Sequence, residues 1–199
     1  MDIILSSDAV DVQECDILAA GFFMDEKPLK GAAGWLDWRL NGALSRFVID
    51  RKLTGEWKET TLVPSQGRLT APILLLFGLG EIRDYSYLRL REFSPHLLET
   101  LKKLNASRIC ISLPYGEAYN VDCGKLAEVI IEGFADCLDM EDHPLDEDWI
   151  KGLTLFFAEG EEHFSEILIG VQTAKSMMED RFPIRVFAPT VKSTPEPKE

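Results

Sequence analysis

The sequence predicts an α/β fold with a mostly parallel, mixed β-sheet and helices on both of its faces. Two observations support this prediction. Short apolar runs typical of buried strands alternate with longer helical segments from Leu74 onward, and this order is typical of right-handed crossover units on a parallel sheet. The chain of 199 residues, 46% of them hydrophobic, is also long enough to bury the core of one domain of generous size.

Several segments have the composition of strands. Asp16–Phe23, "DILAAGFF", is a nearly continuous apolar run, which is typical of a strand covered on both faces. Ala71–Phe77 is predicted to be a central strand that ends at Gly78-Leu79-Gly80. The remaining candidates are Asp2–Ser6, Trp57–Val63, Arg108–Leu113, Leu153–Phe157 and, as a final strand or a strap, Ile184–Ala188.

One long helix is predicted after the second strand. Apolar residues recur at spacings of three and four from Ala32 to Val48, so they form one stripe that packs on the sheet. Arg39, Arg46 and Asp50 are expected to face water. Two further helices are expected over Cys123–Leu138 and Glu162–Met178.

The segment Tyr85–Leu104 also has a helical pattern, but it contains Pro95. A proline inside a helix removes one backbone hydrogen bond and clashes with the preceding turn. We therefore expect an interruption and a new helix over Pro95–Leu104, with Ser94 as its N-cap.

The charge of the chain restricts its partners and location. The sequence has 21 Lys and Arg against 34 Asp and Glu, a net charge of −13, which repels the phosphate backbone of nucleic acids. No run approaches the ~18 apolar residues that a membrane helix needs, and Met1-Asp2 does not begin a basic leader segment. We expect a soluble cytoplasmic protein that binds neither nucleic acid nor membrane.

The cysteines are expected to be structural. Cys15, Cys110, Cys123 and Cys137 contain no CxxC pair, and three of them lie in apolar strand or helix patterns. A reduced thiol in such a position packs as a small hydrophobic group. We therefore expect buried thiols without a redox or metal-binding role.

Two glycine-containing loops follow predicted strands, Lys30-Gly31-Ala32-Ala33-Gly34 and Gly78-Leu79-Gly80. Such loops can present backbone N–H groups to a phosphate. The structural alternative is that the glycines let a helix start close to the sheet and let the chain turn after a central strand. Both interpretations stay open from the sequence.

Other polar segments have structural interpretations. The acidic stretch Asp139–Asp148 lacks the ligand spacing and central glycine of a calcium loop and is expected to be a solvated connection. His96, His143 and His163 have no partner visible in the sequence and are expected at the surface or at helix ends. Trp35 could form a subunit contact together with Trp38, or it could pack on the sheet.

An ordered series of motifs resembles the N-terminal domain of the leucyl aminopeptidase family, the zinc-dependent cytosol aminopeptidases. The run Asp16–Phe47 is followed by "GEWKETTLVPS", "ILLLFGLGE" and "YLRLREF". The matching features are Asp16, Gly31, Asp37, Gly55-Glu56, Gly78-Leu79-Gly80 and Leu90-Arg91, and together they cover Asp16–Phe93.

The resemblance implies a macro-domain-like three-layer sandwich over residues 1–189. The segment 190–199 has no core-forming residue after Val191 and is expected to be a disordered tail. The resemblance also implies that the family's two metal ions and catalytic residues lie in a second domain whose "NTDAEGR"-like segment does not occur here. We therefore expect no catalytic residue, no metal ligand and no cofactor in this chain.

The macro-domain resemblance also suggests a ligand site. Macro domains bind ADP-ribose in a crevice at the carboxyl ends of parallel strands, which implies Asp8, Lys30, Gly31, Gly34, Gly78 and Gly80 as candidate ligand-binding residues. Ala20-Gly21-Phe22-Phe23 stands in place of the asparagine-rich macro-domain segment, which argues against removal of ADP-ribose from proteins.

Three functions are consistent with the sequence. The first is a non-catalytic, stand-alone domain that acts in protein assembly or regulation, either as a homo-oligomer or with another protein. The second is a small-ligand module of macro-domain type that binds ADP-ribose or a related nucleotide. The third, metal-dependent aminopeptidase activity, has only the family resemblance in its favour.

Overall fold

A computed structural model describes residues 1–138, 147–178 and 183–188. A seven-stranded sheet lies at the centre, in the order β3-β4-β2-β5-β6-β1-β7. All neighbouring strands pair in parallel except β3, which is antiparallel to β4. The strands are β1 (Asp2–Ser6), β2 (Ile17–Phe22), β3 (Thr60–Pro64), β4 (Ile73–Gly78), β5 (Arg108–Ser112), β6 (Thr154–Ala158) and β7 (Arg185–Phe187). The predicted mostly parallel, mixed sheet is confirmed.

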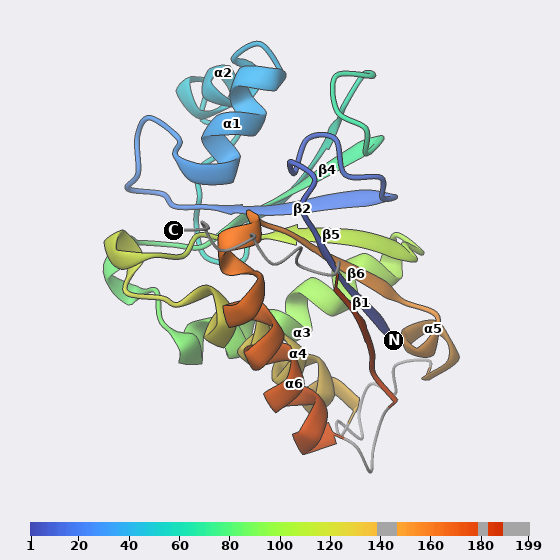
Figure 1. Cartoon of the computed structure of the whole chain (residues 1–199). Helices are drawn as coiled ribbons and strands as arrows, with labels where there is room; N and C mark the ends of the chain where they lie inside the picture. Colours follow the sequence, from blue (N-terminus) through green and yellow to red (C-terminus); the bar gives the residue numbers. More distant parts are fainter. Residues whose placement is uncertain (139–146, 179–182, 189–199) are drawn as a thin grey trace, which may run out of the picture.

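Helices cover both faces of this sheet (Figure 1). One face carries the short helices α1 and α2, and the other carries α3, α4 and α6. Two buried apolar clusters result, one on each side of the sheet. The helices are α1 (Gly31–Arg39), α2 (Ala43–Ile49), α3 (Tyr87–Lys103), α4 (Cys123–Leu138), α5 (Glu147–Lys151) and α6 (Phe164–Met178), with 3₁₀ turns η1 (Ile82–Asp84), η2 (Glu117–Tyr119) and η3 (Glu161–His163).

Several predictions fall outside the described residues or shift slightly. Most of the acidic stretch Asp139–Asp148, with His143, and the tail 190–199 lie outside them.

The third strand begins at Thr60 instead of Trp57, because Lys58 has a positive φ of 62° and turns the chain. None of the described helices is long and apolar enough to cross a bilayer.

The long helix predicted from Ala32 to Val48 is wrong, since the structure has two helices there. Asn41 and Gly42 adopt left-handed φ values of 58° and 71° and separate α1 from α2. The carboxylate of Asp37 then accepts hydrogen bonds from the backbone N–H groups of Leu44 at 2.8 Å and Ser45 at 3.0 Å. The apolar spacing continues across the break, so periodicity alone did not reveal it.

The predicted interruption before Pro95 is also wrong, because α3 is continuous through the proline. Its N-cap is Ser86, which accepts a hydrogen bond from the N–H of Arg89 at 3.4 Å. The buried apolar side chains of α3 lie on both sides of the proline and pack into one core: Leu90, Phe93, Leu97, Leu98 and Leu101. This continuous packing outweighs the cost of an internal proline, about 3 kcal/mol.

Helices α4 and α6 contact each other backbone to backbone. A Cβ atom on Gly170 would overlap the carbonyl oxygen of Gly124, and a Cβ on Gly124 would overlap the carbonyl oxygen of Glu166. Only glycine allows this separation, so the pair fixes how the N-terminal turns of the two helices meet.

Asp37→Ala is expected to destabilise the fold by about 1–2 kcal/mol, because α2 loses the acceptor for two N–H groups of its first turn. Chemical denaturation monitored by circular dichroism measures the difference. Asp50→Ala is the matched control, since Asp50 is exposed and its carboxylate pairs with Lys52 at 3.6 Å. Equal stabilities of the two variants would contradict the capping role.

Gly170→Ala is expected to destabilise the fold by about 1–3 kcal/mol, because the new methyl group must push α6 away from α4. Gly152→Ala is the control, since a Cβ there would lie 3.5 Å from its nearest neighbours, an ordinary contact. Thermal unfolding of both variants gives the comparison. A Gly170→Ala protein as stable as the control would show that the helices adjust without cost.

Candidate functional site

A crevice of about 410 Å³ opens where three parallel strands end. Its walls include Gly21 from β2, Ser112 and Leu113 at the end of β5, and Ala158 and Glu159 at the end of β6. Parallel pairing of β2 with β5 and of β5 with β6 brings these ends to one edge of the sheet. Ligands of open α/β sheets bind at this edge. The remaining lining residues are Val10, Gly31, Ala32, Trp35, Pro114, Tyr115 and Tyr119.

The N-terminus of α1 forms one wall of the crevice. Gly31 has a φ of 53°, and no atom lies within 4 Å of the position that its Cβ would occupy. Lys30 is the N-cap and provides no side-chain cap. The first N–H groups of a helix have no partner within the helix, and they carry partial positive charge. This wall can therefore donate hydrogen bonds to an anionic group.

Trp35 provides an aromatic surface beside that helix terminus. Its Nε1–H donates to Oδ1 of Asp11 at 2.8 Å, and Arg39 pairs with the other oxygen of Asp11 at 2.8 Å. Asp11 is buried, with 4% of its surface exposed, whereas Trp35 is 46% exposed. The indole is thus held at its edge, and the residue stays partly exposed where it lines the crevice.

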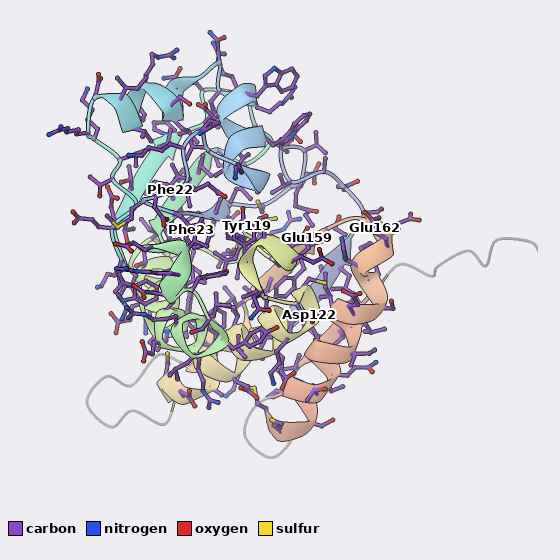
Figure 2. All side chains as sticks on the ribbon, turned by 90° about the vertical axis from the view of Figure 1, so that its left-hand side faces the viewer. Phe22, Phe23, Tyr119, Asp122, Glu159 and Glu162 are labelled. Atoms are coloured by element: carbon purple, nitrogen blue, oxygen red, sulfur yellow. The ribbon has the colours of Figure 1, made fainter. Side chains whose placement is uncertain are left out.

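Polar and aromatic side chains complete the opposite wall. Tyr115 donates its hydroxyl hydrogen to Oε2 of Glu159 at 2.8 Å. Burial raises the pKa of Glu159 above its ordinary value, against the opposing effect of this hydrogen bond. Tyr119 stacks on Phe23 with a centroid distance of 5.3 Å, and Figure 2 shows Phe23, Tyr119 and Glu159 in a row across this face.

Tyr119 also ties the crevice to the loop before α1. Its hydroxyl donates to Oε1 of the buried Glu26 at 2.9 Å, and Lys30 lies 3.5 Å from the same oxygen. Burial, and then the hydrogen bond with Glu26, raise the pKa of Tyr119 to about 12. These contacts position the N-terminus of α1 against the wall that follows β5.

The candidate residues from the sequence take different places. Gly31 lines the crevice, and Lys30 occupies the N-cap position of the helix that forms its wall, without a side-chain hydrogen bond to that helix. Gly34 packs against the backbone of Leu29. A Cβ atom added to Gly34 would lie 2.5 Å from the carbonyl oxygen of Leu29. Asp8 is exposed in the loop after β1, where its N–H donates to Oγ of Ser6 at 3.2 Å.

Gly78 and Gly80 pack against the segment Gly55–Trp57. A Cβ on Gly78 would overlap the carbonyl oxygen of Glu56, and a Cβ on Gly80 would lie 3.7 Å from Cβ of Trp57. The two glycines thus allow two backbone segments to pack closely beside β4. They do not line the crevice, which lies at the ends of β2, β5 and β6.

Three lining residues, Ser112, Tyr115 and Glu159, were not predicted from the sequence. Each of them lies at, or within three residues of, the carboxyl end of β5 or β6. Ligands of open α/β sheets bind beyond the carboxyl ends of strands, and this rule applies to β5 and β6 as much as to the strands that precede Gly31 and Gly78. The sequence therefore contains the signal for these residues, namely polar side chains at and directly after two apolar strand segments.

A slightly larger hollow, about 440 Å³, lies between α2 and the edge strand β3. Its wall includes the side chains of Phe47, Lys52 and Arg68. It is remote from the carboxyl ends of the central strands and from the N-terminus of α1. We therefore regard the crevice as the better candidate site, because polar groups from several elements converge there.

A separate cluster joins the start of α4 to the start of α6. The thiol of Cys123 donates to Oε2 of Glu166 at 2.8 Å, and its sulfur lies 3.7 Å from Nδ1 of His163. Burial, and then the hydrogen bond with Glu166, raise the pKa of Cys123 to about 12. All four cysteines are buried and free, as expected. A partner for His163 was not expected, because Cys123 lies 40 residues away in the sequence.

Comparisons of the fold point to two groups of solved structures. A tomato leucine aminopeptidase superimposes with a TM-score of 0.60 and 17% identity, covering 89% of this chain and 37% of that one. A Trypanosoma brucei macrodomain in complex with ADP-ribose superimposes with a TM-score of 0.61 and 16% identity, covering 83% and 67%. These likenesses confirm the expected macro-domain-like α/β fold.

Sequence comparison gives relatives of much greater length. A probable cytosol aminopeptidase of Alkaliphilus metalliredigens is 29% identical over 118 residues, or 59% of this chain. Another from a Geobacter species is 33% identical over 114 residues, or 57% of this chain. This chain spans 23% of the length of each of these relatives.

The family model of the cytosol aminopeptidase N-terminal domain matches residues 19–138. This match covers most of the sheet, the N-terminus of α1 and the whole of α4. It includes the motifs Gly31, Asp37 and Gly78-Leu79-Gly80 on which the resemblance was based. Because more than half of the chain is matched, this protein belongs to the cytosol aminopeptidase family through its N-terminal domain.

Proposed function

We propose that this protein binds a small anionic ligand of the nucleotide class, such as ADP-ribose, in the crevice at the ends of β2, β5 and β6. The observation that carries the proposal is the convergence on one crevice of a helix N-terminus without a side-chain cap and the partly exposed indole of Trp35. Its volume of about 410 Å³ lies within the range of small-molecule sites, roughly 300–1,000 Å³.

Each part of such a ligand has a chemical counterpart in the crevice. The diphosphate would accept hydrogen bonds from the N–H groups of the first turn of α1, starting at Gly31 and Ala32. The base would stack on Trp35. A macrodomain of similar fold was solved with ADP-ribose, which supports this class of ligand. We include a cytoplasmic location in the proposal, because the relatives are named cytosol aminopeptidases.

Trp35→Ala is expected to weaken ADP-ribose binding by about 10- to 100-fold, because loss of one base-stacking surface costs about 1–3 kcal/mol. Isothermal titration calorimetry with ADP-ribose, ADP and NAD measures the affinity. Trp38→Ala is the matched control, since Trp38 lies on the same helix, is 65% exposed and lies outside the crevice lining. Absence of binding heat for the unmodified protein, or equal weakening by both variants, would refute the proposal.

Glu159→Gln is expected to reduce the pH dependence of binding. Because burial raises the pKa of Glu159, its negative charge develops at a higher pH than for an ordinary carboxyl group. Affinity for an anionic ligand should then fall as pH rises through that raised pKa, and it should fall less in the variant. Affinities measured between about pH 5 and about pH 8 give the difference.

The variant retains Tyr115, Glu162 and His163, which interact with Glu159, so the difference between the two proteins isolates the one carboxyl group. Glu161→Gln, on the exposed surface of η3, is the control. Parallel pH profiles for Glu159→Gln and the unmodified protein would show that Glu159 does not face the ligand.

A second candidate function is protein assembly or regulation without catalysis. The observation that favours it is the exposed tryptophan pair on α1, with Trp35 and Trp38 rings 4.9 Å apart. Exposed aromatic pairs are frequent in protein interfaces. Native mass spectrometry would show an oligomer that Trp38→Ala dissociates. A monomer at tens of micromolar for both proteins would exclude self-assembly through this surface.

A further inference from the structure

The cluster of Cys123, His163 and Glu166 has the composition and spacing of a metal site. Among the described residues, these three bring a sulfur, a nitrogen and a carboxylate oxygen within 4.8 Å of one another. The sulfur lies 2.8 Å from Oε2 of Glu166 and 3.7 Å from Nδ1 of His163, and Nδ1 lies 3.7 Å from Oε2.

These separations resemble those around tetrahedral zinc. With zinc–ligand bonds of about 2.0–2.3 Å, the ligand atoms of a tetrahedral site lie about 3.3–3.6 Å apart. Two of the three observed separations differ from this range by little. The third separation, from the sulfur of Cys123 to Oε2 of Glu166, is shorter because the thiol donates a hydrogen bond directly to the carboxylate. An ion between the three atoms would therefore require only a small movement of the exposed Glu166 side chain.

The backbone holds the three ligands in place. Cys123 is the first residue of α4, and its neighbour Gly124 lies against the carbonyl oxygen of Glu166 in α6. His163 and Glu166 are three residues apart across the start of α6, so they share one face of that turn. The ring of Tyr115 packs edge-on against His163 with a centroid distance of 5.2 Å.

Access and charge suit a cation. Cys123 is buried, with 4% of its surface exposed, while the side chain of Glu166 is 51% exposed, so the cluster opens to solvent on one side. The net charge of −13 favours approach of a cation. Three protein ligands leave one tetrahedral position for a water molecule.

We infer that Cys123, His163 and Glu166 bind one Zn²⁺ ion. A mixed set of thiolate, imidazole and carboxylate favours zinc over Mg²⁺ and Ca²⁺, which prefer oxygen ligands. On binding, the thiol proton leaves to solvent and the S–Zn bond replaces the S–H bond. The alternative of a cysteine nucleophile activated by histidine fits less well, because the thiol hydrogen bond runs to Glu166.

Titration of the full, reduced chain with Co²⁺ tests this site without any assumption about ADP-ribose. We expect one Co²⁺ per chain, a near-ultraviolet charge-transfer band from a thiolate ligand and visible bands of tetrahedral intensity. Zn²⁺ should displace the cobalt and remove these bands. Native mass spectrometry gives the stoichiometry, and Zn²⁺ should raise the melting temperature of the unmodified protein.

Matched variants assign the ligands. Cys123→Ala should abolish the charge-transfer band, whereas Cys137→Ala, which removes another buried thiol of the same helix, should preserve it. His163→Gln and Glu166→Gln should each weaken binding by at least about tenfold. Glu161→Gln and His96→Ala should bind as the unmodified protein does, because these two described residues lie outside the cluster.

The inference is overturned if no thiolate band appears, if the band survives Cys123→Ala, or if His96→Ala removes it while His163→Gln does not. Cys123→Ala alters a buried position, so its folding is checked by circular dichroism. His163→Gln and Glu166→Gln change side chains that reach the surface, and they keep the test decisive if Cys123→Ala does not fold.

Discussion

Parallel pairing of the central strands is the constraint on which both sites depend. In the register of the sheet, Ile17 of β2 lies opposite Ile109 of β5, and Ile109 lies opposite Leu155 of β6. The carboxyl ends of these strands therefore reach the same edge, and the segments that follow each strand must cross there. The crevice is formed by those segments, and the start of α4 and the start of α6 lie beyond the ends of β5 and β6.

The second constraint is the contact between α4 and α6. Gly124 and Gly170 allow the two backbones to touch, and this contact brings Cys123 to the first turn of α6. Tyr115 then connects the two sites, because its hydroxyl binds Glu159 in the crevice wall while its ring packs on His163. Ligand binding in the crevice and metal binding at the cluster would thus share one side chain.

The electrostatics of the crevice differ from those of the whole surface. A protein with a net charge of −13 repels a diphosphate at long range. The proposed binding would therefore depend on short-range donors, and the N-terminus of α1, which has no side-chain cap, offers backbone N–H groups without adding a mobile charged side chain. The raised pKa of Glu159 also favours an anionic ligand, since this carboxyl group in the crevice wall becomes negatively charged only at a higher pH than an ordinary carboxyl group.

The sequence by itself determined the fold class, the order of the strands along the chain, the helix Cys123–Leu138 and the last helix, which begins at Phe164 two residues after the predicted start at Glu162. Apolar runs and helical periodicity are local signals, and a parallel sheet follows from their alternation. The sequence also identified Gly31, which lines the crevice.

Tertiary structure decided the rest. Asp37 caps a helix that begins after Gly42, and continuous packing carries α3 through Pro95, because contacts between distant residues outweigh local preference. The pairing of Tyr115 with Glu159 joins residues 44 positions apart, and Cys123 meets Glu166 across 43 positions. These contacts depend on the order of strands in the sheet and on the separation of two helices. Neither of these produces a periodic pattern in the sequence.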